Sequence, residues 1–154
     1  MLNYISVEKN STVVKANSVV TNHYWRPQDA SCLTNLQKST CPAVTLPDGS
    51  SLHPTQQGIL PLTSILSSEA RRATILHDLK SASPISLGQL CNDDCKVLLN
   101  KKSLHVFKDK DLVLKGTRNT RDRLWDVPLH NPNPLQASYH QPPIHPSIYP
   151  KNWV

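Results

Sequence analysis

The chain contains four cysteines. Paired cysteine thiolates can hold a structural zinc ion, so these residues are the first candidates for a chemical role. Each half of such a site usually takes two ligands spaced by two to four residues. Cys91 and Cys95 have that spacing, whereas eight residues separate Cys32 from Cys41, and His105 is a ligand in reserve. We therefore predict buried free thiols rather than a zinc site, and no disulfides in a reducing compartment.

The other reactive side chains form no recognisable arrangement. The seven histidines are dispersed, and no serine or cysteine nucleophile motif accompanies them. His130, His140 and His145 lie in a proline-rich stretch, where a solvated linker is a simpler interpretation than a weak metal site. The four glycines are solitary, so the sequence contains no phosphate-binding loop. We expect neither a metal nor a cofactor.

One short stretch nevertheless has the frame of a catalytic motif. Residues 17–24 read Asn-Ser-Val-Val-Thr-Asn-His-Tyr. This stretch resembles the first catalytic strand of the aspartic protease in copia-type retrotransposon polyproteins, which reads Asp-Ser/Thr-Gly-Ala-Thr/Ser and is followed by a polar residue, a histidine and an aromatic. Ser18 and Thr21 match that pattern, but Asn17 replaces the aspartate and Val19 replaces the glycine.

Further segments resemble the same polyprotein family in the same order, over roughly residues 13 to 129. The strongest is residues 84–91, Pro-Ile-Ser-Leu-Gly-Gln-Leu-Cys, which is close to the family's Leu-Ile-Ser-Ile/Val-Gly-Gln-Leu element. The others are residues 44–51, 55–62, 73–79, 95–99, 112–118 and 124–129. The resemblance implies an all-β fold, a small closed barrel of the retropepsin-like type, in a degenerate copy of a Gag-Pol protease region. It also implies that Cys91 and Cys95 are core residues.

The two replacements remove what the family's chemistry requires. An aspartic protease uses two carboxylates that share one proton, and in the retroviral type each subunit of a homodimer contributes one. An amide at Asn17 cannot act as the base, which forfeits at least the ~10²–10⁴-fold of general acid–base catalysis. Val19 is β-branched and lacks the freedom of glycine. We predict no catalytic residue, and a degenerate site at Asn17, Ser18, Val19 and Thr21 that forms a buried strand end. Deamidation of Asn17 would restore an aspartate but leave Val19.

Short apolar runs separated by turn residues predict the strands that must position these residues. We expect strands at 4–7 and 12–14, and a hairpin in which 108–110 link strands at 103–107 and 111–114. Pro47, Asp48 and Gly49 predict a tight turn after a strand at 44–46. The one short helix expected spans 86–91, with Ser83 and Pro84 at its start, and 67–71 is a further candidate helical turn.

Composition limits the organisation to one domain and a tail. The chain has 154 residues, enough for a single core. Seven of its 13 prolines lie from Pro128 onward. We therefore predict a protease-like domain over 3–129 and a disordered Pro/His-rich tail over 130–154. No apolar run reaches the ~20 residues of a membrane span, and the start lacks signal-peptide features. An intracellular location, cytoplasmic or nuclear, is expected.

The formal charge of +6 allows contact with nucleic acid or another anionic partner. The basic residues are scattered along the sequence, without a block of five or six like charges, so we expect at most weak binding of this kind. The family resemblance adds a homodimer as an expected assembly. Two functions remain open, a catalytically inactive retrotransposon remnant and a host-adopted binding or dimerisation module. An active protease is a remote third.

Overall fold

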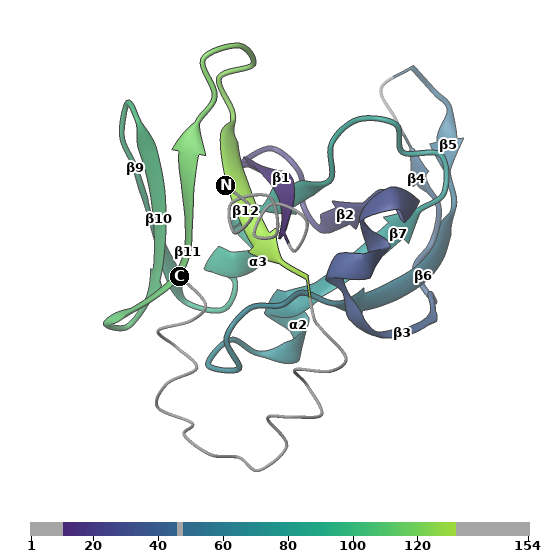
Figure 1. Ribbon diagram of the computed structural model, residues 1–154. Helices are drawn as coiled ribbons and strands as arrows, with labels where there is room; N and C mark the ends of the chain where they lie inside the picture. Colours follow the sequence, from purple (N-terminus) through teal and green to yellow (C-terminus); the bar gives the residue numbers. More distant parts are fainter. Residues whose placement is uncertain (1–10, 46–47, 132–154) are drawn as a thin grey trace, which may run out of the picture.

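The computed structural model describes residues 11–45 and 48–131 of the chain, and about half of them belong to β-strands (Figure 1). A six-stranded sheet has the order β8-β1-β12-β11-β10-β9, and a four-stranded sheet has the order β2-β7-β6-β3. The strands of the first sheet are β1 (Ser11–Asn17), β8 (Pro84–Ser86), β9 (Cys95–Leu99), β10 (Ser103–Lys108), β11 (Asp111–Arg118) and β12 (Trp125–His130). The expected β-rich fold is confirmed. The six-stranded sheet curls into a half-barrel with β8 and β9 at its edges.

Strand β1 brings distant segments together within the six-stranded sheet. It pairs antiparallel with β12, where Ala16 faces Trp125, and parallel with β8, where Asn17 faces Ser86. Its side chains alternate as a strand with one buried face requires. Val14 and Ala16 are fully buried, whereas Val13 is 53% exposed. The end of β1 is therefore fixed from both sides.

The second sheet lies beside the first (Figure 1). Its strands are β2 (His23–Trp25), β3 (Thr34–Lys38), β6 (Pro54–Ile59) and β7 (Arg72–Leu76). Strand β2 runs parallel to β7, and β7 and β3 are each antiparallel to β6. Strands β4 (Val44–Thr45) and β5 (Ser51–Leu52) form a separate small hairpin. Gly49 lies in its turn with φ +89°, a conformation that favours glycine.

A single apolar core joins the two sheets. It includes Val14 from β1, Trp25 from β2, Ile75 from β7 and Leu104 from β10, all at most 2% exposed. The indole N–H of Trp25 donates to the Asp29 carbonyl at 3.0 Å, so its polar atom is satisfied inside the core.

Within the described residues, three helical segments connect the strands, against the one short helix and one further candidate turn expected. They are the 3₁₀ helix η1 (Pro27–Cys32) and the α-helices α2 (Ser68–Arg71) and α3 (Leu87–Cys91). The predicted turn at 67–71 is confirmed, since the Ser67 hydroxyl caps α2. The predicted helix at 86–91 is confirmed as α3, one residue shorter at its start, but the predicted cap at Ser83 and Pro84 was wrong. Residues 84–86 form β8, and the cap is the Ser86 hydroxyl, which accepts from the Gln89 N–H at 3.0 Å.

Most strand predictions within the described residues are confirmed. Residues 12–14 lie in β1, residues 44–45 in β4, and β10 pairs with β11 as an antiparallel hairpin with a register shift after Val106. Residues 4–7 and most of the predicted tail lie outside the described residues. His130, the first residue of the predicted tail, is the last residue of β12 and pairs with Ser11.

Candidate functional site

Asn17 is the last residue of β1, and its side chain shapes the loop that follows. The Asn17 amide oxygen accepts from the backbone N–H of Val19 at 2.7 Å, which forms an Asx-type turn. The prediction of a buried strand end was wrong: Ser18 and Thr21 are exposed, and Val19 is 83% exposed. Val19 is not among the described non-glycine residues with positive φ. The loop therefore has a conformation that a β-branched residue adopts without strain.

Asn17 lies on the wall of a cleft of about 410 Å³. The small hairpin provides Val44 and Leu52, and the segment from β7 to β8 provides Leu76 and Leu79 among others. The remaining lining residues are Lys15, Val20, Tyr24, Ser81, Ala82, Pro84, Asp122 and Leu124. Most of the side chains are apolar, as in sites that enclose an organic ligand or an extended peptide. The amide of Asn17 is thus a polar group beside an apolar groove.

The cleft has one carboxylate among its lining residues, and that group is already paired. A carboxylate oxygen of Asp122 lies 2.9 Å from Nζ of Lys15, and Lys15 also forms a close ion pair with Asp126. The Leu124 N–H and the Lys15 ammonium lower the pKa of Asp122 from its ordinary value. The hydrogen bond to Asp126 raises the pKa of Lys15. Asp122 is held as an anion beside a cation, which is the opposite of a carboxyl pair that shares a proton.

A buried histidine takes part in the hydrogen bonds that hold the loop after Asn17 in place. His23 is fully buried, and its Nε2–H donates to the Ala70 carbonyl at 2.7 Å. Its Nδ1 accepts from the backbone N–H of Ser86 at 2.8 Å. Burial lowers the pKa of His23 to about 4, so the ring is neutral at physiological pH. The Ser86 hydroxyl donates to the Val20 carbonyl at 2.8 Å and so anchors the loop directly.

Gln89 completes this support by joining three elements. Its side-chain oxygen accepts from the His23 N–H at 2.7 Å. Its Nε2 group donates to the Glu69 carbonyl at 2.7 Å and to the Arg72 carbonyl at 2.9 Å. In the sequence, His23, Ser86 and Gln89 were identified only as matches to the family pattern, and no role was predicted for them. The sequence feature that could have identified them is a polar side chain within an otherwise apolar strand or helix pattern.

The cysteines do not gather. Among residues 11–45 and 48–131, no group of three His, Cys, Asp or Glu side chains could hold a metal ion. Cys32 and Cys95 are buried free thiols as predicted, and burial raises their pKa values to about 12 and about 11. Cys41 and Cys91 are exposed, which corrects the prediction of buried thiols and the core role expected for Cys91. The ring of His105, the reserve zinc ligand, stacks on Phe107 instead.

Comparison with protein-family models, with curated proteins and with solved structures finds no match to this chain. Within the part of the chain that the structure describes, no helix is long and apolar enough to cross a membrane.

Proposed function

We propose that this chain is a catalytically inactive protease-like domain, derived from the aspartic protease of a copia-type retrotransposon polyprotein. The observation that carries the proposal is Asn17, an amide at the end of a fixed strand and on the wall of an apolar cleft. An aspartic protease needs a carboxylate at such a position. The amide can bind a peptide group through hydrogen bonds but cannot take a proton from water.

Two structural features support the family origin. The parallel pair β1–β8 ends at Asn17 and is followed at once by α3, and these two segments carry the two clearest sequence resemblances. The β4–β5 hairpin contributes Val44 and Leu52 to the cleft that Asn17 lines. Retroviral proteases likewise close hairpin flaps over their substrates. Closure of the half-barrel and a homodimer, in which two Asn17 side chains would replace the two aspartates, belong to this proposal.

The decisive experiment restores the two lost residues. A copia-type cleavage-site peptide is incubated near pH 5 with the wild-type chain, with Asn17→Asp/Val19→Gly, and with Asn22→Asp. The last variant adds a carboxylate in the same loop at a position outside the cleft lining. Cleavage by the double variant alone supports the proposal. Cleavage by the wild type overturns the claim that the chain is inactive. Absence of cleavage by a double variant that circular dichroism shows to be folded counts against the protease origin.

A second candidate function, a peptide-binding module adopted by a host, is favoured by the apolar lining of the cleft. Val44, Leu79 and Leu124 are partly exposed in the cleft and offer contacts for alternate side chains of an extended segment. The test is binding of the same peptide, labelled with a fluorophore, to the wild type and to Leu79→Asp. Leu36→Asp is the matched control, because Leu36 is 44% exposed on β3 and does not line the cleft. Binding that is lost only in Leu79→Asp supports the module, and equal binding by all three proteins contradicts it.

A further inference from the structure

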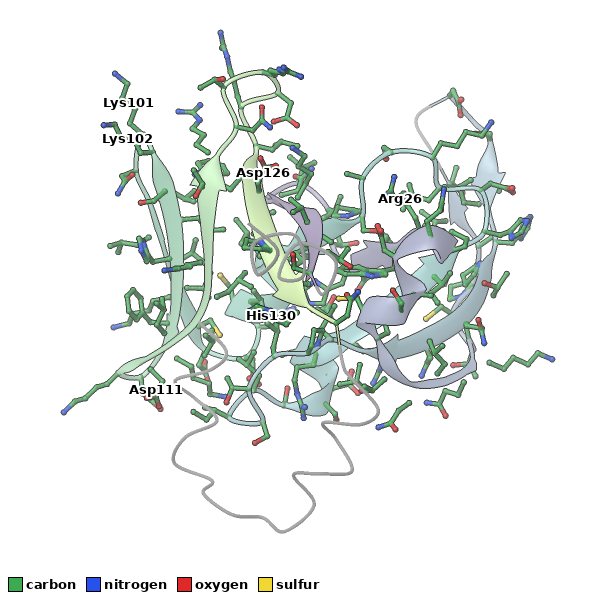
Figure 2. All side chains as sticks on the ribbon, in the orientation of Figure 1. Arg26, Lys101, Lys102, Asp111, Asp126 and His130 are labelled. Atoms are coloured by element: carbon green, nitrogen blue, oxygen red, sulfur yellow. The ribbon has the colours of Figure 1, made fainter. Side chains whose placement is uncertain are left out.

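Basic residues that are scattered in the sequence meet at one end of the six-stranded sheet. Lys101 and Lys102 lie between β9 and β10, Arg118 ends β11, and Arg123 lies in the link to β12. All four line one hollow of about 580 Å³. The remaining lining residues are Thr117, Asn119 and Thr120. We call this set of seven residues the basic hollow. Figure 2 shows Lys101 and Lys102 at one end of the β9–β10–β11 segment and Asp111 at the opposite end.

The neighbouring carboxylates do not neutralise the basic hollow. Asp122 and Asp126 are closest to it along the chain, and both pair with Lys15. The ion pairs of the described residues include none of the four cations of the hollow. Arg123 is therefore uncompensated although Asp122 precedes it in sequence. Four like charges around one concavity produce a local positive potential that attracts anions.

One of these cations is already ordered. The guanidinium carbon of Arg118 lies 5.5 Å from the centre of the Trp125 ring, and its Nε–H donates to the Arg123 carbonyl at 3.4 Å. Both contacts reduce the freedom that Arg118 would lose on binding a ligand. An arginine held in this way offers a planar cation on which an unpaired base can stack. The hydroxyl groups of Thr117 and Thr120 add hydrogen-bonding groups for phosphate and sugar oxygens. The amide of Asn119 is already engaged, since its Nδ2 group donates to Asp126 and its oxygen accepts from the Arg121 and Asp122 N–H groups.

We propose that the basic hollow binds the phosphodiester backbone of single-stranded nucleic acid. A chain of repeating anions matches several cations around one concavity, and charge contacts of this kind dominate non-specific affinity. An anionic membrane surface fits less well, because membrane-binding surfaces add apolar side chains that enter the lipid, and among residues 11–45 and 48–131 no large apolar side chain lines this hollow. The proposal does not depend on the protease origin of the domain.

The test is fluorescence anisotropy with a labelled oligouridylate of about 12 nucleotides, within the range of known single-strand sites. Affinity is measured between about 50 and 200 mM salt, and four phosphate contacts give a log–log slope of about −3. The variant Lys101→Gln/Lys102→Gln/Arg123→Gln removes three of the four cations, so we expect a slope near −1 and at least tenfold weaker binding at about 100 mM salt.

The matched control is Lys38→Gln/Lys96→Gln/Lys110→Gln, which changes three exposed lysines outside the hollow. Each triple variant lowers the formal charge from +6 by 3 to +3. Near-wild-type binding by the control and weak binding by the hollow variant, with both folded by circular dichroism, support the proposal. Equal weakening in both variants, or no RNA binding by the wild type, overturns it. Binding of phosphatidylserine vesicles but not RNA, lost in the hollow variant, also overturns it and assigns the surface to lipid.

Discussion

The backbone N–H of Ser86 donates to Nδ1 of His23 over 2.8 Å, between residues that are 63 positions apart in the chain. The other ring nitrogen of His23 donates to the Ala70 carbonyl at 2.7 Å. The neutral ring with its proton on Nε2 satisfies both contacts. A second proton would face the Ser86 N–H, so protonation and this hydrogen bond exclude each other. The arrangement couples the β8–α3 junction to β2 and to the end of α2, and through Ser86 to the loop after Asn17.

The first prediction is that stability falls in mild acid because of His23. Burial lowers its folded-state pKa to about 4 from an unfolded value near 6.5. Between these values the unfolded chain binds a proton that the folded chain does not, so this contribution is complete above about pH 6.5 and is lost as the pH falls toward 4. The shift corresponds to about 3 kcal/mol at its full extent. Urea unfolding followed by circular dichroism at several pH values measures the loss.

Two variants separate His23 from the other titrating groups in that experiment. His23→Gln should be less stable at neutral pH and should show a smaller decrease in stability toward pH 4. His77→Gln is the control, because His77 is exposed, and its stability should follow the wild-type curve. The assignment fails if His23→Gln keeps the full acid-dependent decrease.

The second prediction concerns Gln89, whose side chain makes three hydrogen bonds to backbone groups of His23, Glu69 and Arg72. Gln89→Leu should cost about 2–3 kcal/mol, because the backbone groups lose their partners in a partly buried place. Gln89→Glu should cost at least as much, since a carboxylate can accept from the His23 N–H but cannot donate to the two carbonyls. The free energy of unfolding at neutral pH measures both effects. Stability equal to wild type in Gln89→Glu would contradict the assigned orientation of the amide.

Sequence reasoning predicted local pairings well and long-range arrangement poorly. The β10–β11 hairpin was predictable because alternation and a short polar link are adjacent in the sequence. The strand at residues 84–86 was not predictable. The Ser83-Pro84 pair is typical of a helix start, and the parallel pairing with β1 overrides that local preference. The exposed loop after Asn17 was also missed, since apolar Val19 and Val20 indicate burial in a sequence pattern.

The same limit applies to charge and to the supporting residues of the candidate site. The sequence shows Arg121, Asp122 and Arg123 as a mixed run, and nothing local indicates that Asp122, in the loop between β11 and β12, pairs with Lys15 of β1. The uncompensated charge of the basic hollow follows from that distant pairing. Likewise, the contacts of Gln89 reach residues 17, 20 and 66 positions away, a relationship that a single sequence does not reveal.

The third prediction is that the four thiols react in two classes. Cys41 and Cys91 are exposed, whereas Cys32 and Cys95 are buried with pKa values raised to about 12 and about 11. Because the thiolate is the reactive form, a disulfide reagent at about pH 8 should modify two thiols quickly in the folded chain and all four in urea. Cys41→Ser/Cys91→Ser should abolish the fast phase. Rapid modification of Cys32 in the folded double variant would contradict the burial described here.

The fourth prediction contrasts two glycines. A Cβ atom at Gly116 would lie 2.7 Å from the Asp126 carbonyl oxygen and 3.0 Å from a methyl group of Val127. Both neighbours belong to β12, which pairs with β11 just beyond this point, so Gly116→Ala must push the two strands apart. We expect a loss of about 2–3 kcal/mol, in the range of overpacked cores.

Gly88 provides the matched control for that substitution. It is exposed within α3, and the nearest atom to an added Cβ is the Ser86 hydroxyl oxygen at 3.7 Å, an ordinary contact. Gly88→Ala should therefore leave stability unchanged or raise it by up to about 1 kcal/mol, because alanine loses less backbone entropy in a helix. Chemical unfolding of both variants compares the two sites with the same added methyl group. Equal stability of Gly116→Ala and Gly88→Ala would show that β11 and β12 do not approach as closely as the structure has them.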